Sequence, residues 1–305
     1  MRREDKWWAV CAWGTSAPFI SDLVKMVGLN FKEYILHEGK RMIVDPGNGK
    51  TFDIKLNGLV CFDKTRLFKD MKKGKTIHYD SHITNADDLK EFDMIIDATG
   101  FHRSLMPKLK KDASIPCFEV EVEGKFPWED FYIKPYPTLS GYFWYFPLGP
   151  GRGHIGAGDF KSQYRGEIEE MVKKNDWKVV RRIGRPVRIL PPAYCQPFYT
   201  GKVVGVGESI GTVYPLLGEG IIPSMQCVNL FVEHMDNLEA YSEAVLKHYD
   251  IYAKVYRFID AKMKGNFSWI RQGPELWSVY RHMKNGERRY GLETHLRDIL
   301  KVVNV

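Results

Sequence analysis

One stretch decides the fold of this chain of 305 residues: VVGVGESIGTVYPLLGEGI, residues 203–221. Its apolar start, within residues 202–207, predicts a buried strand that stops at glycine and delivers an acidic residue, Glu208. Glycines and Pro215 then lead to helical apolar spacing from Gly220 to about Met235. The N–H groups that begin such a helix would stabilise an anion, or a ring that develops negative charge. A tight strand–loop–helix joint without a ligand is the alternative for a GxGxxxG pattern alone.

A second apolar strand, residues 93–97, ends in Ala98-Thr99-Gly100. Small residues after a strand allow it to end beneath a bound dinucleotide. The same three residues also make an ordinary turn, so the pattern alone leaves both interpretations open.

An aromatic run, YFWYFP at residues 142–147, is followed after eight residues by Gly156-Ala157-Gly158. In a strand, Tyr142, Trp144 and Phe146 project to one face because side chains alternate. Three rings on one face would form an apolar wall for a long hydrocarbon, and the paired glycines would permit close approach of a backbone or a flat ring. A sheet packed on its own core is the alternative.

The rest of the chain shows α/β pieces, a β-rich insertion, a strand that feeds a helix, and a helical tail. Apolar spacing predicts helices at residues 16–27, 65–71 and 163–175, and mostly helix from Leu238 onward. Strands are predicted around the Pro46–Gly49 turn within residues 39–57, at 114–160 and at 178–190. This order favours an α/β fold in which a nucleotide-binding layer is interrupted by a substrate sheet.

Composition narrows the function less than the motifs do. The net charge of +7 would suit anionic lipids, phosphates or nucleic acid, but no nucleic-acid motif accompanies it, and we expect no nucleic-acid partner. Five scattered cysteines without metal-ligand spacing favour reduced thiols in a cytoplasmic protein and no metal site. No apolar run reaches the roughly 18 residues that span a bilayer, so we expect any membrane contact to be peripheral.

The three motifs together resemble the geranylgeranyl reductase family of FAD-dependent oxidoreductases. YFWYFPLGPGRGHIGAG, residues 142–158, is similar to the Y-x-W-x-F-P motif and later G-x-G that line that family's substrate cavity. Residues 203–221 resemble its second FAD motif, and MIIDATGFHRS, residues 94–104, matches its strand ending in A-T-G. Residues 58–71 show weaker similarity. The likeness runs from about Cys11 to about Val232.

The resemblance implies a flavoprotein of isoprenoid lipid biosynthesis. In the family, reduced FAD gives hydride to one alkene carbon of a geranylgeranyl-type chain and a proton reaches the other, so an electron donor is also implied. Cys11 and Tyr214 are the candidate catalytic residues. The implied cofactor contacts are Gly14, Ala98, Thr99, Gly100, Gly207, Glu208, Pro215, Gly218, Gly220 and Ile221. The implied substrate contacts are Tyr142, Trp144, Phe146, Pro147, Gly156 and Gly158.

The sequence departs from the family in two places. Members begin with a strand, a G-x-G-x-x-G turn and a helix that hold the FAD pyrophosphate. Here the start, WWAVCAWGTSAPF at residues 7–19, resembles a later segment of the family. About the first forty residues of a family member therefore have no counterpart in this sequence. We therefore expect an incomplete Rossmann-like layer, and FAD binding only when a longer reading frame or a partner chain supplies this unit. The second departure is Glu208, where the family usually has Asp.

We expect the FAD-binding-like layer at residues 1–112 and 196–237, a β-rich substrate domain at 113–195 and a helical region at 238–305. Two other functions stay open. One is a non-catalytic relative that binds prenyl lipid, and the other is a different FAD-dependent oxidoreductase of hydroxylase, halogenase or cyclase type. His154 is expected in a loop, and Trp269 and Trp277 are expected to pack between helices.

Overall fold

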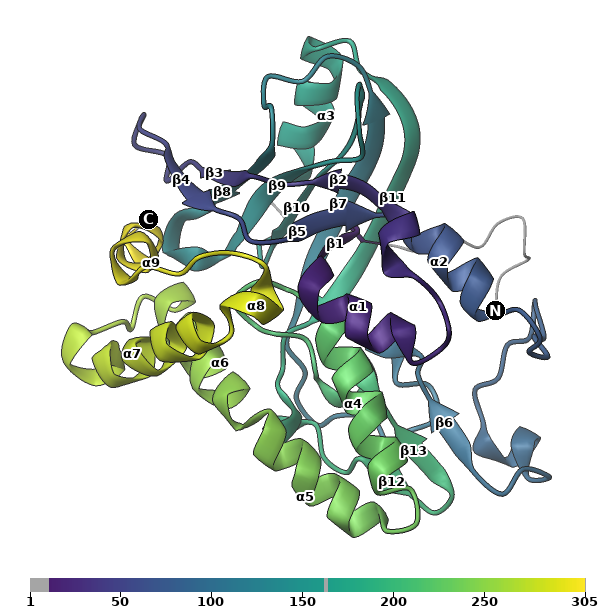
Figure 1. Cartoon of the computed structure of the whole chain (residues 1–305). Coiled ribbons are helices and arrows are strands. Elements are labelled where there is room, and N and C mark those ends of the chain that lie inside the picture. Colours follow the sequence, from purple (N-terminus) through teal and green to yellow (C-terminus); the bar gives the residue numbers. More distant parts are fainter. Residues whose placement is uncertain (1–10, 162–163, 305) are drawn as a thin grey trace.

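A computed structural model describes residues 11–161 and 164–304 of the chain (Figure 1). Within these residues the strands form three sheets, and helices pack around them. The expected α/β class, with an antiparallel β insertion and a helical C-terminal region, is confirmed. Residues 7–10 of the start that resembles the family lie outside the described residues, as do residues 162 and 163 of the predicted helix at 163–175.

One of the two three-stranded sheets pairs the strand before the glycine loop with the strand before the A-T-G turn. Strand β13 (Val203–Gly205) runs parallel to β6 (Ile95–Asp97), with Gly205 opposite Asp97, and β12 (Tyr199–Thr200) pairs antiparallel with β13. Because parallel strands end at the same edge, the A-T-G turn and the loop at 206–220 lie side by side. This edge is where open α/β sheets place their ligands.

The large sheet has seven strands in the order β11-β7-β10-β9-β8-β3-β4. All neighbours are antiparallel except β3 and β8. The sheet is therefore built from segments on both sides of residue 112. Its strands are β3 (Arg41–Val44), β4 (Phe52–Lys55), β7 (Ser114–Glu123), β8 (Phe131–Pro135), β9 (Gly141–Pro147), β10 (Arg152–Asp159) and β11 (Lys178–Arg188).

One face of the large sheet packs against α3 (Arg165–Lys174). Phe143, Tyr145 and Ile155 are buried there with Trp177 in an aromatic cluster. Figure 1 shows α3 at the top and the C-terminal helices at the lower left, on opposite sides of this sheet. The alternation of side chains along each strand thus gives the sheet one face that packs against α3 and one face turned toward the C-terminal helices.

The third sheet, in the order β1-β5-β2, joins the beginning of the described chain to the rest. Its strands and the helices beside it are β1 (Gly14–Ser16), β2 (Ile35–Glu38), β5 (Leu59–Phe62), α1 (Ala17–Lys25) and α2 (Lys64–Met71). The four residues of β5 are all buried. β1 pairs with β5 and places the half-buried Gly14 against the Phe146 ring of the large sheet.

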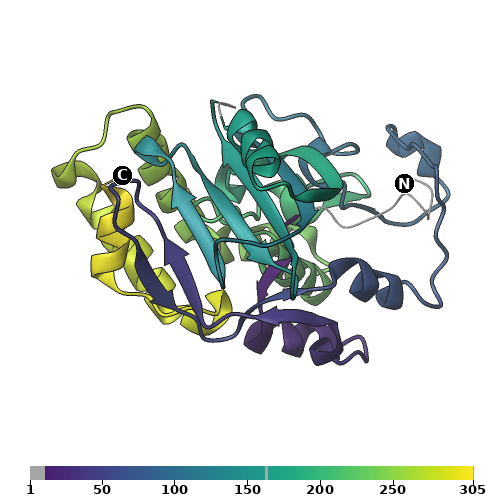
Figure 2. The same ribbon diagram turned by 90° about the horizontal axis from the view of Figure 1, so that it is seen from above.

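The C-terminal region is helical, as predicted. Figure 2 shows these yellow and green helices gathered beside the β3–β4 hairpin. Lys301 places its ammonium 4.2 Å from the centre of the Phe52 ring on β4, which ties the last helix to the sheet. The helices are α4 (Ile221–Glu233), α5 (Leu238–His248), α6 (Asp250–Met263), α7 (Trp269–Asn285), α8 (Glu287–Tyr290) and α9 (Leu296–Val303).

Candidate functional site

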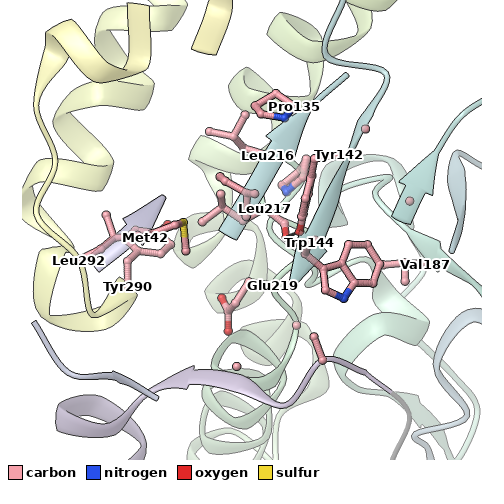
Figure 3. A pocket seen from close by; sticks show the side chains of 18 of the residues that line it. Met42, Pro135, Tyr142, Trp144, Val187, Leu216, Leu217, Glu219, Tyr290 and Leu292 are labelled. Carbon is pink, nitrogen blue, oxygen red and sulfur yellow. Dashed lines mark hydrogen bonds between the residues drawn. The ribbon is translucent and has the colours of Figure 1, made fainter. Parts of the chain in front are cut away.

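A cavity of about 480 Å³ lies between the large sheet, the loop at 215–220 and the C-terminal helices. Gly220 and Trp144, which come from the two strongest motifs, both line it. Figure 3 shows Leu217 and Glu219 of the loop beside Trp144 of the sheet, with Tyr290 further along the cavity. The structure therefore brings the glycine loop and the aromatic wall into one hollow.

The loop has a defined shape because its backbone closes on itself. The N–H of Tyr214 donates to the carbonyl of Glu219 at 2.8 Å, and the N–H of Gly218 donates to the carbonyl of Tyr214 at 2.9 Å. Gly218 has φ of +61°, a left-handed conformation that favours glycine. Helix α4 then begins after Gly220, which has no side chain to cap it. The start of α4 thus presents backbone to the cavity.

A buried ion pair connects this loop to the C-terminal helices. Arg289 donates to the Glu219 carboxylate at 2.7 Å and to the Tyr252 hydroxyl at 3.1 Å. The other Glu219 oxygen accepts the N–H of Ile222 at 3.0 Å and so caps α4. Burial raises the pKa of Glu219, and Arg289 opposes that effect. Glu219 and Arg289 both line the cavity, and sequence analysis did not single out either of them.

The aromatic wall is fixed to the loop and to the N-terminal strand. The hydroxyl of Tyr142 donates to the carbonyl of Leu217. The Phe146 ring lies so close to Gly14 that a Cβ at this glycine would collide with it. A Cβ at Gly156 would likewise collide with the Trp144 indole. These two glycines therefore make room for the rings rather than for a ligand.

Behind Trp144 lies a buried polar cluster made of Glu119, Glu121 and His154. The indole N–H of Trp144 donates to Glu119 at 3.2 Å. His154 lies 3.8 Å from Glu119 and 3.9 Å from Glu121, and its ring meets Trp13 edge-on. The expectation of a loop histidine was wrong: His154 lies in β10 and is 3% exposed. The glycine-rich spacer suggested a loop, but the β9–β10 pairing continues through it.

The two candidate catalytic residues lie in different surroundings. Cys11 lines the cavity, and its Sγ accepts from the Lys64 ammonium at 3.3 Å. Tyr214 is fully buried and is not among the residues that line the cavity. Its ring packs against Tyr252 and Tyr290, so it supports Tyr290, which lines the cavity. Burial raises the pKa of Tyr214, which makes its hydroxyl a poorer acid.

The A-T-G turn is held by Asp97, whose carboxylate accepts the hydroxyl of Thr99 at 2.6 Å and the N–H of Leu105 at 2.8 Å. Glu208 accepts the N–H of Arg188 at 2.8 Å and touches the cavity. Burial raises the pKa of Glu208, while hydrogen bonds from backbone N–H groups lower it in part. Both carboxylates thus organise the edge where β6 and β13 end.

Most of the residues singled out from sequence meet at the cavity. Those that line it are Cys11, Gly14, Tyr142, Trp144, Phe146, Gly158, Glu208, Pro215, Gly218, Gly220 and Ile221. The others are not in its lining: Ala98, Thr99, Gly100, Pro147, Gly156, Gly207 and Tyr214.

Trp269 and Trp277 do not pack between helices as expected. Both lie on α7, where they are 50% and 51% exposed, and their neighbour Ile270 is 90% exposed. The cavity side of α7 carries Leu276, Val279 and Met283 instead. Among the described residues, no helix has the length and apolar character needed to cross a membrane.

Curated relatives share modest sequence identity with the chain. An uncharacterised protein of Methanocaldococcus jannaschii is 25% identical over 83% of this chain and 79% of its own length. Digeranylgeranylglycerophospholipid reductase 2 of Methanopyrus kandleri is 25% identical over 64% of this chain. The match spans 60% of that reductase, less than two thirds of its length. No family model matches the chain.

Solved structures define the fold class. A geranylgeranyl bacteriochlorophyll reductase-like protein from Thermoplasma acidophilum has a TM-score of 0.64 at 12% identity and covers 83% of this chain and 78% of its own. Flavin-dependent halogenases and a probable FAD-dependent monooxygenase share this fold. The fold is thus that of FAD-dependent oxidoreductases, and the relatives' names confirm that the chain resembles the geranylgeranyl reductase family of these enzymes.

Proposed function

We propose that this protein is a flavin-dependent reductase that saturates double bonds of a geranylgeranyl-type lipid chain. One observation carries the proposal: the glycine loop at the start of α4 and the aromatic wall of β9 share one cavity. The first suits a ring that gains negative charge, and the second suits a hydrocarbon. The names of the archaeal reductases that match the sequence support the same substrate class.

The residues at the loop end of the cavity fit an FAD isoalloxazine ring. The start of α4 offers partial positive charge and backbone N–H groups, of which that of Ile222 is already bound by Glu219. The hydroxyl of Thr15 and one nitrogen of Arg289 are buried there without a hydrogen-bond partner among the described residues. Gly218 and Gly220 line the cavity at this end. When bound and reduced, FAD would supply hydride, while these groups orient the ring and favour its negative charge.

The opposite end of the cavity fits an isoprenoid chain. Its lining is mostly apolar and comes from three C-terminal helices and the hairpin β3–β4, including Ile54, Phe258, Leu276, Val279 and Val302. Near α9 the lining also contains the polar residues Glu293, Thr294, His295 and Asp298. An unbranched polar substrate would leave its hydrogen-bonding groups unpaired against the apolar side chains. Burial of a methyl-branched hydrocarbon against these apolar side chains is favourable.

The test is anaerobic incubation with excess FAD, dithionite and a geranylgeranyl phospholipid in deuterated water. Mass spectrometry should find saturated double bonds. At each one, one carbon should carry a deuterium from the solvent, and the other should carry the hydrogen or deuterium that the flavin transferred. Lipid retained without any saturation would indicate a non-catalytic prenyl-lipid-binding protein. Oxygen-dependent hydroxylation or halogenation without saturation would contradict the proposal in favour of the other FAD-dependent classes.

We also propose that another strand pairs with β6 and completes the nucleotide-binding layer. Among the described residues, β6 pairs only with β13, and Ile96 on this strand is 40% exposed. Val228 and Val232 on α4 are exposed as well. Parallel sheets are normally covered on both faces, and an unpaired edge accepts a further strand. The 305-residue chain alone should therefore bind FAD weakly in a fluorescence titration, and tight stoichiometric binding would contradict this.

The exposed side of helix α7 suits contact with the membrane surface from which a lipid substrate would arrive. Helix α7 exposes Trp269, Ile270 and Trp277 on one side and lines the cavity with the other. Tryptophan beside arginine, here Arg271 and Arg281, suits the boundary between lipid headgroups and acyl chains. We infer that α7 contacts the membrane surface that holds the substrate. Vesicle co-sedimentation that is unchanged in the Trp269→Ala, Ile270→Ser double variant would contradict this.

A further inference from the structure

Glu119 is a buried carboxyl group on the wall of the cavity. The candidate catalytic residues are Cys11 and Tyr214, so Glu119 has no role in the chemistry described above. It lies on β7, is 7% exposed and touches the cavity beside Trp144. The Trp144 indole N–H donates to one of its oxygens at 3.2 Å. Burial of a carboxyl group costs free energy unless the group is hydrogen-bonded and is either protonated or paired with a charge. Its position between the aromatic wall and the interior suits proton transfer.

A line of polar groups connects Glu119 to the surface. His154 Nδ1 lies 3.8 Å from Glu119 and has no hydrogen-bond partner among the described residues. His154 Nε2 lies 3.9 Å from Glu121, which accepts from Arg152 at 2.8 Å. The Arg152 side chain is 41% exposed. The two gaps at His154, 3.8 Å and 3.9 Å, are longer than hydrogen bonds.

The surroundings of the two glutamates on this strand shift their pKa values in opposite directions. Burial raises the pKa of Glu119, although His154, Trp144 and Lys64 oppose it. For Glu121, burial acts upward but His154 and Arg152 outweigh it, and the pKa is lowered to about 2. Carboxyl groups whose environments separate their pKa values in this way serve as acid and as charged partner in enzymes. The titratable groups that face Glu119 are His154, Lys64, Glu121, Cys117 and Cys61.

We propose that Glu119 donates the proton in alkene reduction and is reprotonated through His154; this rests on the proposed reductase function. A reduced flavin, when bound, would supply hydride to one alkene carbon as the π bond breaks and would itself be oxidised by two electrons. The other carbon forms a C–H bond with the Glu119 proton. The O–H bond of Glu119 breaks and leaves a carboxylate, to which His154 returns a proton taken up from solvent.

The decisive variant is Glu119→Gln, because its amide oxygen still accepts the Trp144 N–H while the acidic proton is gone. We expect the single-turnover rate of alkene reduction to fall about 100-fold or more, with prenyl-lipid binding unchanged. The matched control is Glu123→Gln on the same strand, whose carboxylate is exposed and pairs with Lys178 at 2.8 Å. It should keep the wild-type rate. Wild-type reduction by Glu119→Gln would overturn the inference and leave Glu119 as a mere support for Trp144.

A second measurement does not depend on activity. Infrared difference spectra between wild type and Glu119→Gln should show a protonated carboxyl that persists above the ordinary glutamate pKa of 4.5. A carboxyl that titrates at that ordinary value would overturn the inference. If wild type binds prenyl lipid but reduces none, the proposed function fails, and the infrared result still decides whether Glu119 holds a proton.

Discussion

The two faces of the large sheet use the same strands for different purposes. On β9, Phe143 and Tyr145 point toward α3 and are packed among other rings, including Trp128. Trp144 and Phe146, one residue away in each case, point into the cavity. The α3 face is apolar and filled. The cavity face has glycines, a hollow and charged groups, so the aromatic motif packs a core on one face of the sheet and lines a cavity on the other.

The largest expected effect distinguishes the two faces by stability. Phe143→Ala should lower the free energy of unfolding by about 3–5 kcal/mol, because it removes a fully buried ring from a packed cluster. Trp144→Ala should cost about half as much, because its ring borders a hollow. Urea unfolding measures both. Equal losses would mean that the cavity face is packed as tightly as the other.

The second prediction concerns pH, since charged groups lie on the cavity face. The folded-state pKa of Glu121, about 2, lies below its unfolded value of 4.5. Glu121 therefore stabilises the fold above pH 4.5, and this contribution is lost as the pH falls toward 2. At about 1.4 kcal/mol per pKa unit, we expect a loss of about 2–3 kcal/mol.

The measurement is urea unfolding of wild type and Glu121→Gln across this pH range. The variant should show a correspondingly weaker dependence on pH. Phe143→Ala, altered on the other face, should keep the wild-type slope. A Glu121→Gln slope equal to that of wild type would show that this carboxylate is not held by its neighbours.

The third prediction uses the glycines of the cavity face. Gly156→Ala should push the Trp144 indole out of place, cost about 1–2 kcal/mol and weaken prenyl-lipid binding. Gly184→Ala is the matched control on β11, where the nearest atom to a new Cβ lies 3.6 Å away. Calorimetry and lipid titration of both variants check this. Equal behaviour of the two would mean that Trp144 is free to move.

The smallest effect on stability is expected on the outer side of α7. Trp269→Ala should change the free energy of unfolding by less than about 0.5 kcal/mol, because half of this ring is already exposed. It should nevertheless reduce binding to anionic vesicles. A loss of several kcal/mol would show that the ring is a structural element, as on the α3 face.

The sequence predicted the framework well because its signals are local. The strand, glycine loop and helix around residues 203–233 follow from hydrophobic spacing and turn residues. Glu119 was missed because it lies in an alternating E-V-E-V-E pattern, which is typical of a strand with one solvent face. Only the tertiary position of the C-terminal helices turns that face into a cavity wall. Tyr214, a candidate catalytic residue, does not line the cavity for the same reason: its burial depends on α6 and α8.

The central claim is that the aromatic wall and the C-terminal helices enclose one lipid chain in the cavity that the glycine loop also lines, and photolabelling tests it most directly. A geranylgeranyl phospholipid that carries a diazirine on its chain would be irradiated with the protein, and the labelled peptides identified by mass spectrometry. We expect labels on both Tyr142–Phe146 and Leu276–Met283, each removed by unlabelled lipid. Labels confined to the exposed Trp269 and Trp277 would place the lipid on the surface and contradict the account.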